Sequence, residues 1–134
     1  MTDLPRQPIH SDQAPAAIGP YSQATRASGG AAMVFCSGQI PLDPATGELV
    51  EGDIGVQARR AFDNLRAVCE AAGGSFDDVV RVGLYLTNLG QFAAVNAVMA
   101  DYFQAPYPAR STIEVTALPK GAAFEVDAIL VLRG

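Results

Sequence analysis

The chain has 134 residues, of which 49% are hydrophobic and 17% charged, a composition that suits one buried core and hence a single domain over residues 1–134. Its net charge of −5 and nine scattered Lys and Arg residues argue against a surface for nucleic acid. The two cysteines, Cys36 and Cys69, lack the spacing of metal ligands. The N-terminus lacks the apolar core of a signal peptide, and no apolar run reaches the roughly 20 residues that span a bilayer. We therefore expect a cytoplasmic protein without metal, membrane or nucleic-acid partners.

The first third of the chain predicts an arm followed by strands. Residues 1–20 hold four prolines and should be extended, with a short edge strand around Ile9. Residues 21–28 and 32–39 flank Gly29-Gly30, which is a hairpin signal. The run Met33–Cys36 is nearly all apolar, so this strand is predicted to be buried on both faces.

Two helices follow, separated by a strand over residues 80–87. Asp53 can cap the first helix, and Gly73-Gly74 ends it. The apolar residues between them recur at helical spacing and should face the core. Cys69 lies on that inner face and is interpreted as a packing thiol. Asn88 with Gln91 resembles a capping box for the second helix. That helix should bury Leu89, Phe92, Val95, Met99 and Tyr102 or Phe103.

The chain ends in two strands, over residues 107–115 and 124–132, joined by a turn at Pro119-Lys120-Gly121. The order is ββαβαββ, an α+β fold with a mixed sheet and both helices packed on one face. We expect the polar residues Arg110, Thr112, Glu125 and Asp127 on the opposite face. That face also carries Ile129, Val131 and the Met33–Cys36 run, and such a large apolar surface predicts a closed oligomer.

Arg110 is the first candidate for a functional residue. Strand alternation sends Arg110, Thr112 and Glu114 to one face and Ser111, Ile113 and Val115 to the other. The planar guanidinium suits a carboxylate, so Arg110 is a candidate to bind an acidic substrate. An ion pair at a surface or an interface is the structural alternative.

Four motifs resemble a known family in their order and spacing. They are Ala14-Pro15-Ala16-Ala17-Ile18-Gly19-Pro20-Tyr21-Ser22-Gln23, Ser37-Gly38-Gln39-Ile40-Pro41, Pro108-Ala109-Arg110-Ser111 and Leu118-Pro119-Lys120. Together they resemble the RidA (YjgF) family from about Ala14 to the C-terminus. The resemblance implies a chorismate-mutase-like fold, a homotrimer whose sheets form a central barrel, and clefts between subunits. It also implies hydrolysis of 2-aminoacrylate-type and other 2-imino acids to 2-keto acids and ammonia, without a cofactor or metal.

The resemblance also implies roles for residues at matching positions. Arg110 matches the residue that pairs with the substrate carboxylate, and Glu125 the acid that holds or activates the attacking water. Tyr21, Ser37, Gly38, Asn96 and Thr112 match other substrate-binding positions. Many relatives have cysteine where Thr112 stands, so this chain keeps a hydroxyl there and has no thiol.

Three functions remain open at this point. The first is a 2-iminobutanoate/2-iminopropanoate deaminase. The second is a deaminase dedicated to one pathway, such as pyrimidine or aminoaromatic breakdown, and the third is a non-catalytic ligand-binding or chaperone-like protein. A ribonuclease is disfavoured by the negative charge and by the absence of a catalytic histidine, since the single histidine, His10, lies in the proline-rich arm.

Overall fold

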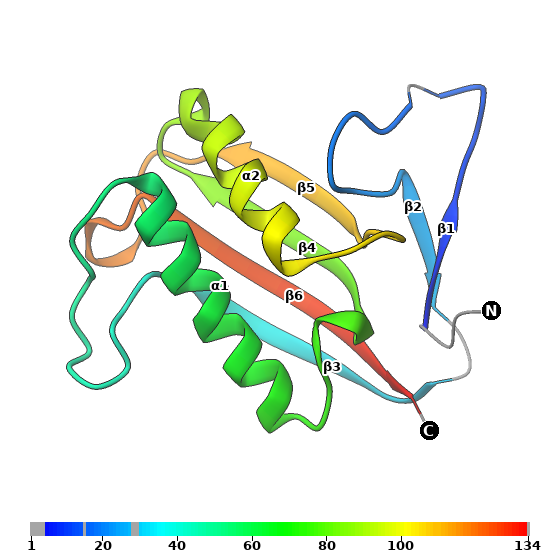
Figure 1. The fold of residues 1–134 in the computed structure, drawn as a ribbon, viewed down its shortest axis with the longest axis horizontal. Helices are drawn as coiled ribbons and strands as arrows, with labels where there is room; N and C mark the ends of the chain where they lie inside the picture. The colour runs from blue at the N-terminus through cyan, green and yellow to red at the C-terminus, as the bar shows by residue number, and fades with distance from the viewer. Residues whose placement is uncertain (1–4, 15, 28–29, 134) are drawn as a thin grey trace.

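The computed structural model describes residues 5–14, 16–27 and 30–133 as a layer of two helices on a four-stranded sheet, beside a two-stranded arm (Figure 1). The sheet has the order β3-β6-β4-β5 and is mixed, because β4 and β5 run parallel. The elements are β1 (Arg6–Ile9), β2 (Ala24–Ala27), β3 (Gly30–Gln39), α1 (Ile54–Ala71), β4 (Val79–Leu86), α2 (Phe92–Tyr102), β5 (Ala109–Glu114) and β6 (Phe124–Arg133). The predicted α+β class is confirmed, and the edge strand expected around Ile9 is β1.

The strand pairing near the N-terminus differs from the predicted hairpin, whose turn includes Gly29, outside the described residues. β2 pairs antiparallel with β1, whereas β3 pairs with β6 at the far edge of the sheet. The reason is that β2 is held beside β4 and β5: Thr25 donates a hydrogen bond to the carbonyl of Val80, and Ser22 forms a bridge with Ala109. The arm therefore lies beside the β5 edge of the sheet (Figure 1).

The local sequence signals predicted where both helices lie. Asp53 caps α1 by accepting a hydrogen bond from the backbone N–H of Val56 at 3.0 Å, and Gly73, with φ of +91°, ends it. Asn88 also acts as a cap, but of a short 3-10 turn over Leu89–Gln91 that precedes α2. Leu89 is 43% exposed, contrary to its predicted burial, because it lies in this turn.

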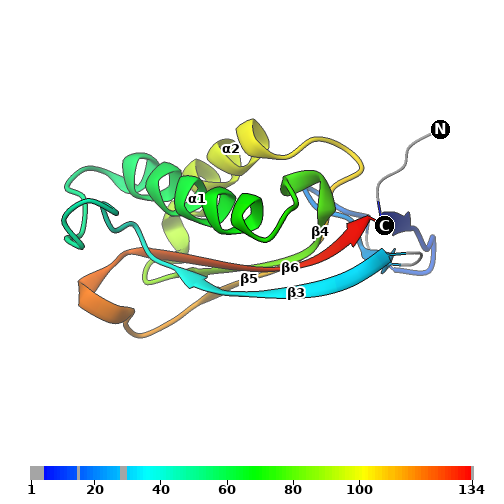
Figure 2. The ribbon, with the colours of Figure 1, turned by 90° about the horizontal axis from the view of Figure 1, so that it is seen from below.

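Both helices cover one face of the sheet and leave the other uncovered (Figure 2). The core between helices and sheet contains Phe62, Leu65, Val82, Leu84, Val95, Met99, Phe103, Phe124 and Val126, all buried, together with Cys69 and Cys36. Both thiols are thus in the core, as predicted. Neither described helix combines the length and apolar character that crossing a bilayer requires.

The register of the sheet corrects the predicted position of Arg110 and Thr112. Arg110 and Thr112 pair with Val82 and Leu84, whose side chains are buried beneath the helices. Gly83 pairs with Asp127, so Glu125 and Asp127 point the other way, to the uncovered face. The prediction that all four polar residues share the uncovered face is therefore wrong for Arg110 and Thr112.

The uncovered face is strongly apolar along its edge strands. Met33 is 58% exposed, Phe35 70% and Ile113 47%, although the sequence predicted burial of β3 on both faces. The alternation in β3 buries Cys36 beneath α1 and turns Phe35 outward. A large exposed apolar patch of this kind is typical of an interaction surface.

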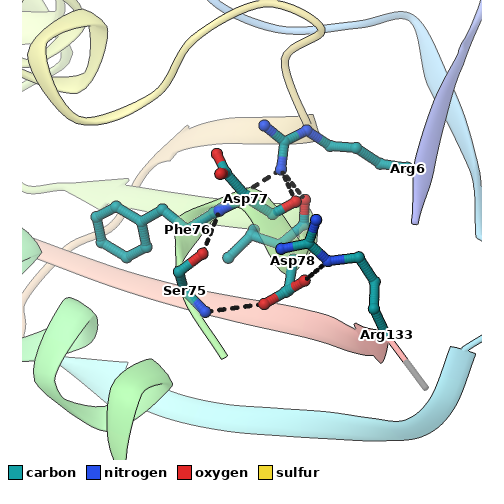
Figure 3. A network of polar contacts seen from close by, with 7 residues as sticks. Arg6, Ser75, Phe76, Asp77, Asp78 and Arg133 are labelled. Atoms are coloured by element: carbon teal, nitrogen blue, oxygen red, sulfur yellow. Dashed lines mark hydrogen bonds and ion pairs between the residues drawn. The ribbon is translucent and has the colours of Figure 1, made fainter. Parts of the chain in front are cut away.

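The arm is fastened to the domain by Arg6, whose side chain is 1% exposed (Figure 3). Its guanidinium donates five hydrogen bonds to backbone carbonyls, those of Phe76, Asp77, Val79, Gln104 and Pro106. These carbonyls belong to the turn before β4, to the first residue of β4 and to the segment between α2 and β5. Beside them, Asp78 accepts hydrogen bonds from Arg133 and from the backbone N–H of Ser75.

Candidate functional site

The guanidinium of Arg110 lies between β5, α2 and the arm, surrounded by the side chains of Tyr21, Phe92, Asn96 and Met99, which we call the cage. Its guanidinium lies 4.8 Å from the ring centroid of Tyr21 and 5.2 Å from that of Phe92. Nη1 donates a hydrogen bond to Oδ1 of Asn96 at 2.5 Å and contacts the sulfur of Met99 at 3.7 Å. These contacts fix the guanidinium in one position while leaving other N–H donors for a ligand.

The arm brings Tyr21 to this position by pairing with the start of β5. The backbone N–H of Ser22 donates to the carbonyl of Pro108 at 3.1 Å, and its hydroxyl donates to the carbonyl of Tyr107. Gly19 passes so close that a Cβ there would lie 3.1 Å from Nδ2 of Asn96 and 3.4 Å from Nη2 of Arg110. A side chain at position 19 would therefore press on the polar ends of Asn96 and Arg110.

A cavity of about 270 Å³ opens beside Arg110. Its lining consists of Ile18, Tyr21, Phe92, Arg110 and Thr112. The walls are mostly apolar, and the charged group lies at one side, an arrangement that suits a small molecule with an anionic end and an apolar body. The hydroxyl oxygen of Thr112 is buried and has no hydrogen-bond partner within the described part of the chain.

The charge of Arg110 is not balanced locally. Among residues 5–14, 16–27 and 30–133, no carboxylate forms an ion pair with it. Burial lowers the pKa of its guanidinium, and only the Tyr21 hydroxyl acts in the opposite direction. A half-buried cation without a carboxylate partner is unfavourable by itself and favours binding of an anion.

Glu125 lies on the other side of the sheet, against Gly38. A Cβ at Gly38 would collide with Oε2 of Glu125, so the carboxylate rests directly over the backbone of β3. Burial raises the pKa of Glu125, and the nearby carboxylate of Asp127 adds to this effect. Ser37, the neighbour of Gly38, is exposed.

The predicted site thus divides into two groups. The structure brings Tyr21, Asn96 and Arg110 together, with Thr112 in the lining of the same cavity. Gly38 and Glu125 form the second group on the uncovered face. Because a sheet lies between the two groups, Arg110 and Glu125 of one chain cannot contact the same small substrate.

Sequence reasoning missed two components of the first group. Phe92 was assigned to the apolar core of the second helix, but its ring packs on Arg110 and lines the cavity. Ile18, which is 88% exposed, lies at the same cavity and belongs to the motif that contains Tyr21. The spacing Phe92, Asn96, Met99 on one helix face was the signal that could have found the cage.

The comparison with known families shows the family to which the chain belongs. Residues 11–132 match the family described as Endoribonuclease L-PSP. The chain belongs to the RidA (YjgF) family. This match covers both groups of predicted site residues.

Two curated relatives are similar to the chain over nearly its whole length. "Protein DfrA" of Myxococcus xanthus is 55% identical over 131 residues, covering 98% of this chain and 99% of the relative. A "2-iminobutanoate/2-iminopropanoate deaminase" of Dermatophagoides farinae is 44% identical over 129 residues, covering 96% of this chain and 98% of the relative.

Two solved structures of RidA-family proteins share the fold. RidA from the Antarctic bacterium Psychrobacter sp. PAMC 21119 has a TM-score of 0.72 at 47% identity and covers 95% of this chain and 100% of its own. TdcF of E. coli, solved with bound serine, has a TM-score of 0.71 at 42% identity and covers 93% and 98%.

Proposed function

We propose that the protein is a cytoplasmic 2-iminobutanoate/2-iminopropanoate deaminase, which hydrolyses 2-imino acids to 2-keto acids and ammonia. The observation that carries this proposal is the Arg110 guanidinium, held by Tyr21, Phe92 and Asn96 beside a cavity and without a carboxylate partner. A 2-imino acid supplies the missing carboxylate and places its apolar side chain against the apolar wall. The Dermatophagoides farinae relative named for this activity and the serine bound to TdcF support a small amino- or imino-acid ligand.

The reaction consumes one water for each imine. The water oxygen bonds to the imine carbon as the C=N π bond breaks, and a carboxylate accepts one water proton and passes it to the nitrogen, which gives a carbinolamine. The hydroxyl proton then moves to the nitrogen by way of the same carboxylate as the C–N bond breaks, so that ammonia leaves and the carbon becomes the keto carbon. In this scheme Arg110 binds the substrate carboxylate, and Glu125 accepts and returns the proton. The scheme uses no cofactor or metal.

Glu125 can serve this reaction only from a second copy of the chain. We infer a homotrimer in which the uncovered face of one subunit supplies Gly38 and Glu125 to the cavity at Arg110 of its neighbour. The exposed side chains of Met33, Phe35 and Ile113 support this inference, because assembly would remove them from water. Light scattering should give about 42 kDa for three 14.0 kDa chains, and Phe35→Glu should reduce both the mass and the activity.

The activity is tested by generating the imine in situ with an amino-acid oxidase and following keto-acid and ammonia release. Loss of the charge-assisted contact in Arg110→Ala should lower kcat/KM by about 10- to 100-fold. Arg59→Ala is the matched control, since Arg59 is an exposed arginine on α1 that pairs with Asp101. Equal activity of wild type and Arg110→Ala would exclude the proposed mechanism.

Subunit mixing tests the shared site directly. Arg110→Ala chains keep Glu125, and Glu125→Gln chains keep Arg110, so refolding the two together should rebuild about a quarter of the clefts with both residues. Arg110→Ala alone should keep about a tenth or less of the wild-type activity, and the mixture should exceed the activity of either variant alone. A mixture no more active than its components would show that the two residues do not serve one cleft.

The family description also names a ribonuclease, and the chain offers little support for that activity. The net charge is −5, and the single histidine, His10, pairs with Asp12 on the exposed arm. Ribonuclease activity in the purified protein that is lost in His10→Ala would overturn this preference.

A further inference from the structure

The uncovered face carries a second carboxylate, that of Asp127, which the proposed function does not use. Asp127 and Glu125 are two residues apart on β6 and point to the same face. Across the sheet, Glu125 pairs with Tyr85 of β4, and Asp127 pairs with Gly83. The two carboxylates are therefore neighbours in a half-buried setting.

Tyr85 holds the carboxylate of Asp127 in one place. Its hydroxyl donates a hydrogen bond to Oδ2 of Asp127 at 3.0 Å. A Cβ at Gly83 would lie 2.5 Å from Oδ1 of Asp127 and 2.7 Å from the Tyr85 hydroxyl, so the pair occupies the space that a side chain at Gly83 would fill. Gly83 is buried beneath them.

No cation neutralises these two carboxylates within the described chain. Arg81, on the same face of β4, donates instead to the hydroxyl of Ser111 on β5 at 3.3 Å. Within one chain, the titratable groups that face Glu125 are Asp127 on its own strand and Tyr85 on β4, and the proposed assembly adds the guanidinium of Arg110 from the neighbouring subunit. Neighbouring carboxylates disfavour each other's ionised form, more so where water is partly excluded.

We propose that Asp127, held by Tyr85 over Gly83, is a positioning residue that tunes Glu125 as the general base of the proposed deaminase. Its negative charge makes the Glu125 carboxylate a better proton acceptor for the attacking water. This inference rests on the proposed function, because it assigns a role to Asp127 only if Glu125 accepts that proton. The raised pKa of Glu125, caused first by burial and then by Asp127, agrees with this geometry.

The test compares Asp127→Asn and Tyr85→Phe with wild type by two independent measurements. The first is the titration midpoint of the Glu125 carboxyl group, followed by NMR of protein carrying ¹³C-labelled glutamate and assigned with Glu125→Gln. The second is the acidic limb of the kcat/KM profile against pH. In Asp127→Asn both should move to lower pH by the same amount. In Tyr85→Phe they should move in the same direction, because the Asp127 carboxylate is no longer held.

Asp101→Asn is the control for removal of one negative charge, since Asp101 is exposed on α2 and far from this face. It should leave both measurements unchanged. An unchanged Glu125 midpoint in Asp127→Asn would overturn the inference. If wild type does not hydrolyse imines, the proposed function fails, yet the NMR titration still decides whether Asp127 and Glu125 are coupled.

Discussion

Replacement of Arg6 by alanine would remove five hydrogen bonds between the arm and the rest of the domain. Two of these bonds, to the carbonyls of Phe76 and Val79, are buried, and the other three lie where water can partly replace them. A hydrogen bond to a charged group contributes about 1.5 to 3 kcal/mol, so the two buried bonds contribute about 3 to 6 kcal/mol. They therefore dominate the effect of the substitution.

Desolvation of the guanidinium offsets part of this gain. Burial lowers the pKa of Arg6, and the nearby Asp77 and Asp78 only partly compensate. We therefore expect Arg6→Ala to lower the free energy of unfolding by about 3 kcal/mol, near the low end of the range. For a domain of this size that corresponds to a fall in Tm of about 10 °C.

Thermal and urea unfolding measure this loss, with Arg26→Ala as the control because Arg26 is an exposed arginine on β2 of the same arm. Arg6→Lys should lose most of the stability as well, since a point-like ammonium cannot reach two groups of carbonyls as the planar guanidinium does. A Tm of Arg6→Ala within about 2 °C of the control would refute the reasoning. The same variant should raise KM, because the arm carries Tyr21 to the cavity.

Three further substitutions test the site. Gly19→Ala would push against Asn96 and Arg110, so it should raise KM for imine substrates in steady-state assays with little change in Tm. Thr112→Val removes a buried hydroxyl without a partner among the described residues and should stabilise the protein by about 1 kcal/mol in urea unfolding. The pKa of Glu125 is raised in the folded chain, so folding favours its protonated carboxyl group. The resulting contribution to the free energy of unfolding is present below the usual pKa of glutamate and is lost as pH rises through the raised pKa. Glu125→Gln should therefore be the more stable protein above that window and equal to wild type below it, as measured by urea midpoints across pH.

The sequence predicted the helices and most strands because their signals are local. The Asp53 cap, the Gly73 stop and the alternation in β6 each depend on a few neighbouring residues, and the structure confirms them. The pairing of β2 with β1 depends instead on contacts of Thr25 and Ser22 with distant strands. No short-range signal such as Gly29-Gly30 reports those contacts.

The position of Arg110 shows a different limit. Alternation correctly grouped Arg110 with Thr112, yet it cannot tell which face of a strand the helices cover. We assigned the polar residues to the uncovered face on polarity alone, and the parallel register of β5 with β4 reverses this for Arg110. Arg6 was missed for a related reason: its partners are backbone carbonyls, which have no residue identity that a sequence pattern could reveal.

Under the proposed function, the division of the site would link catalysis to assembly. Arg110 and its cage are complete within one chain, whereas Glu125 lies on the same uncovered face as the exposed side chains of Met33 and Phe35. If this face covers the cavity of a neighbouring subunit, one contact both buries the apolar side chains and delivers the carboxylate. Dilution that dissociates the oligomer should then abolish hydrolysis while Arg110 still binds a 2-keto acid, so affinity and turnover should separate with protein concentration.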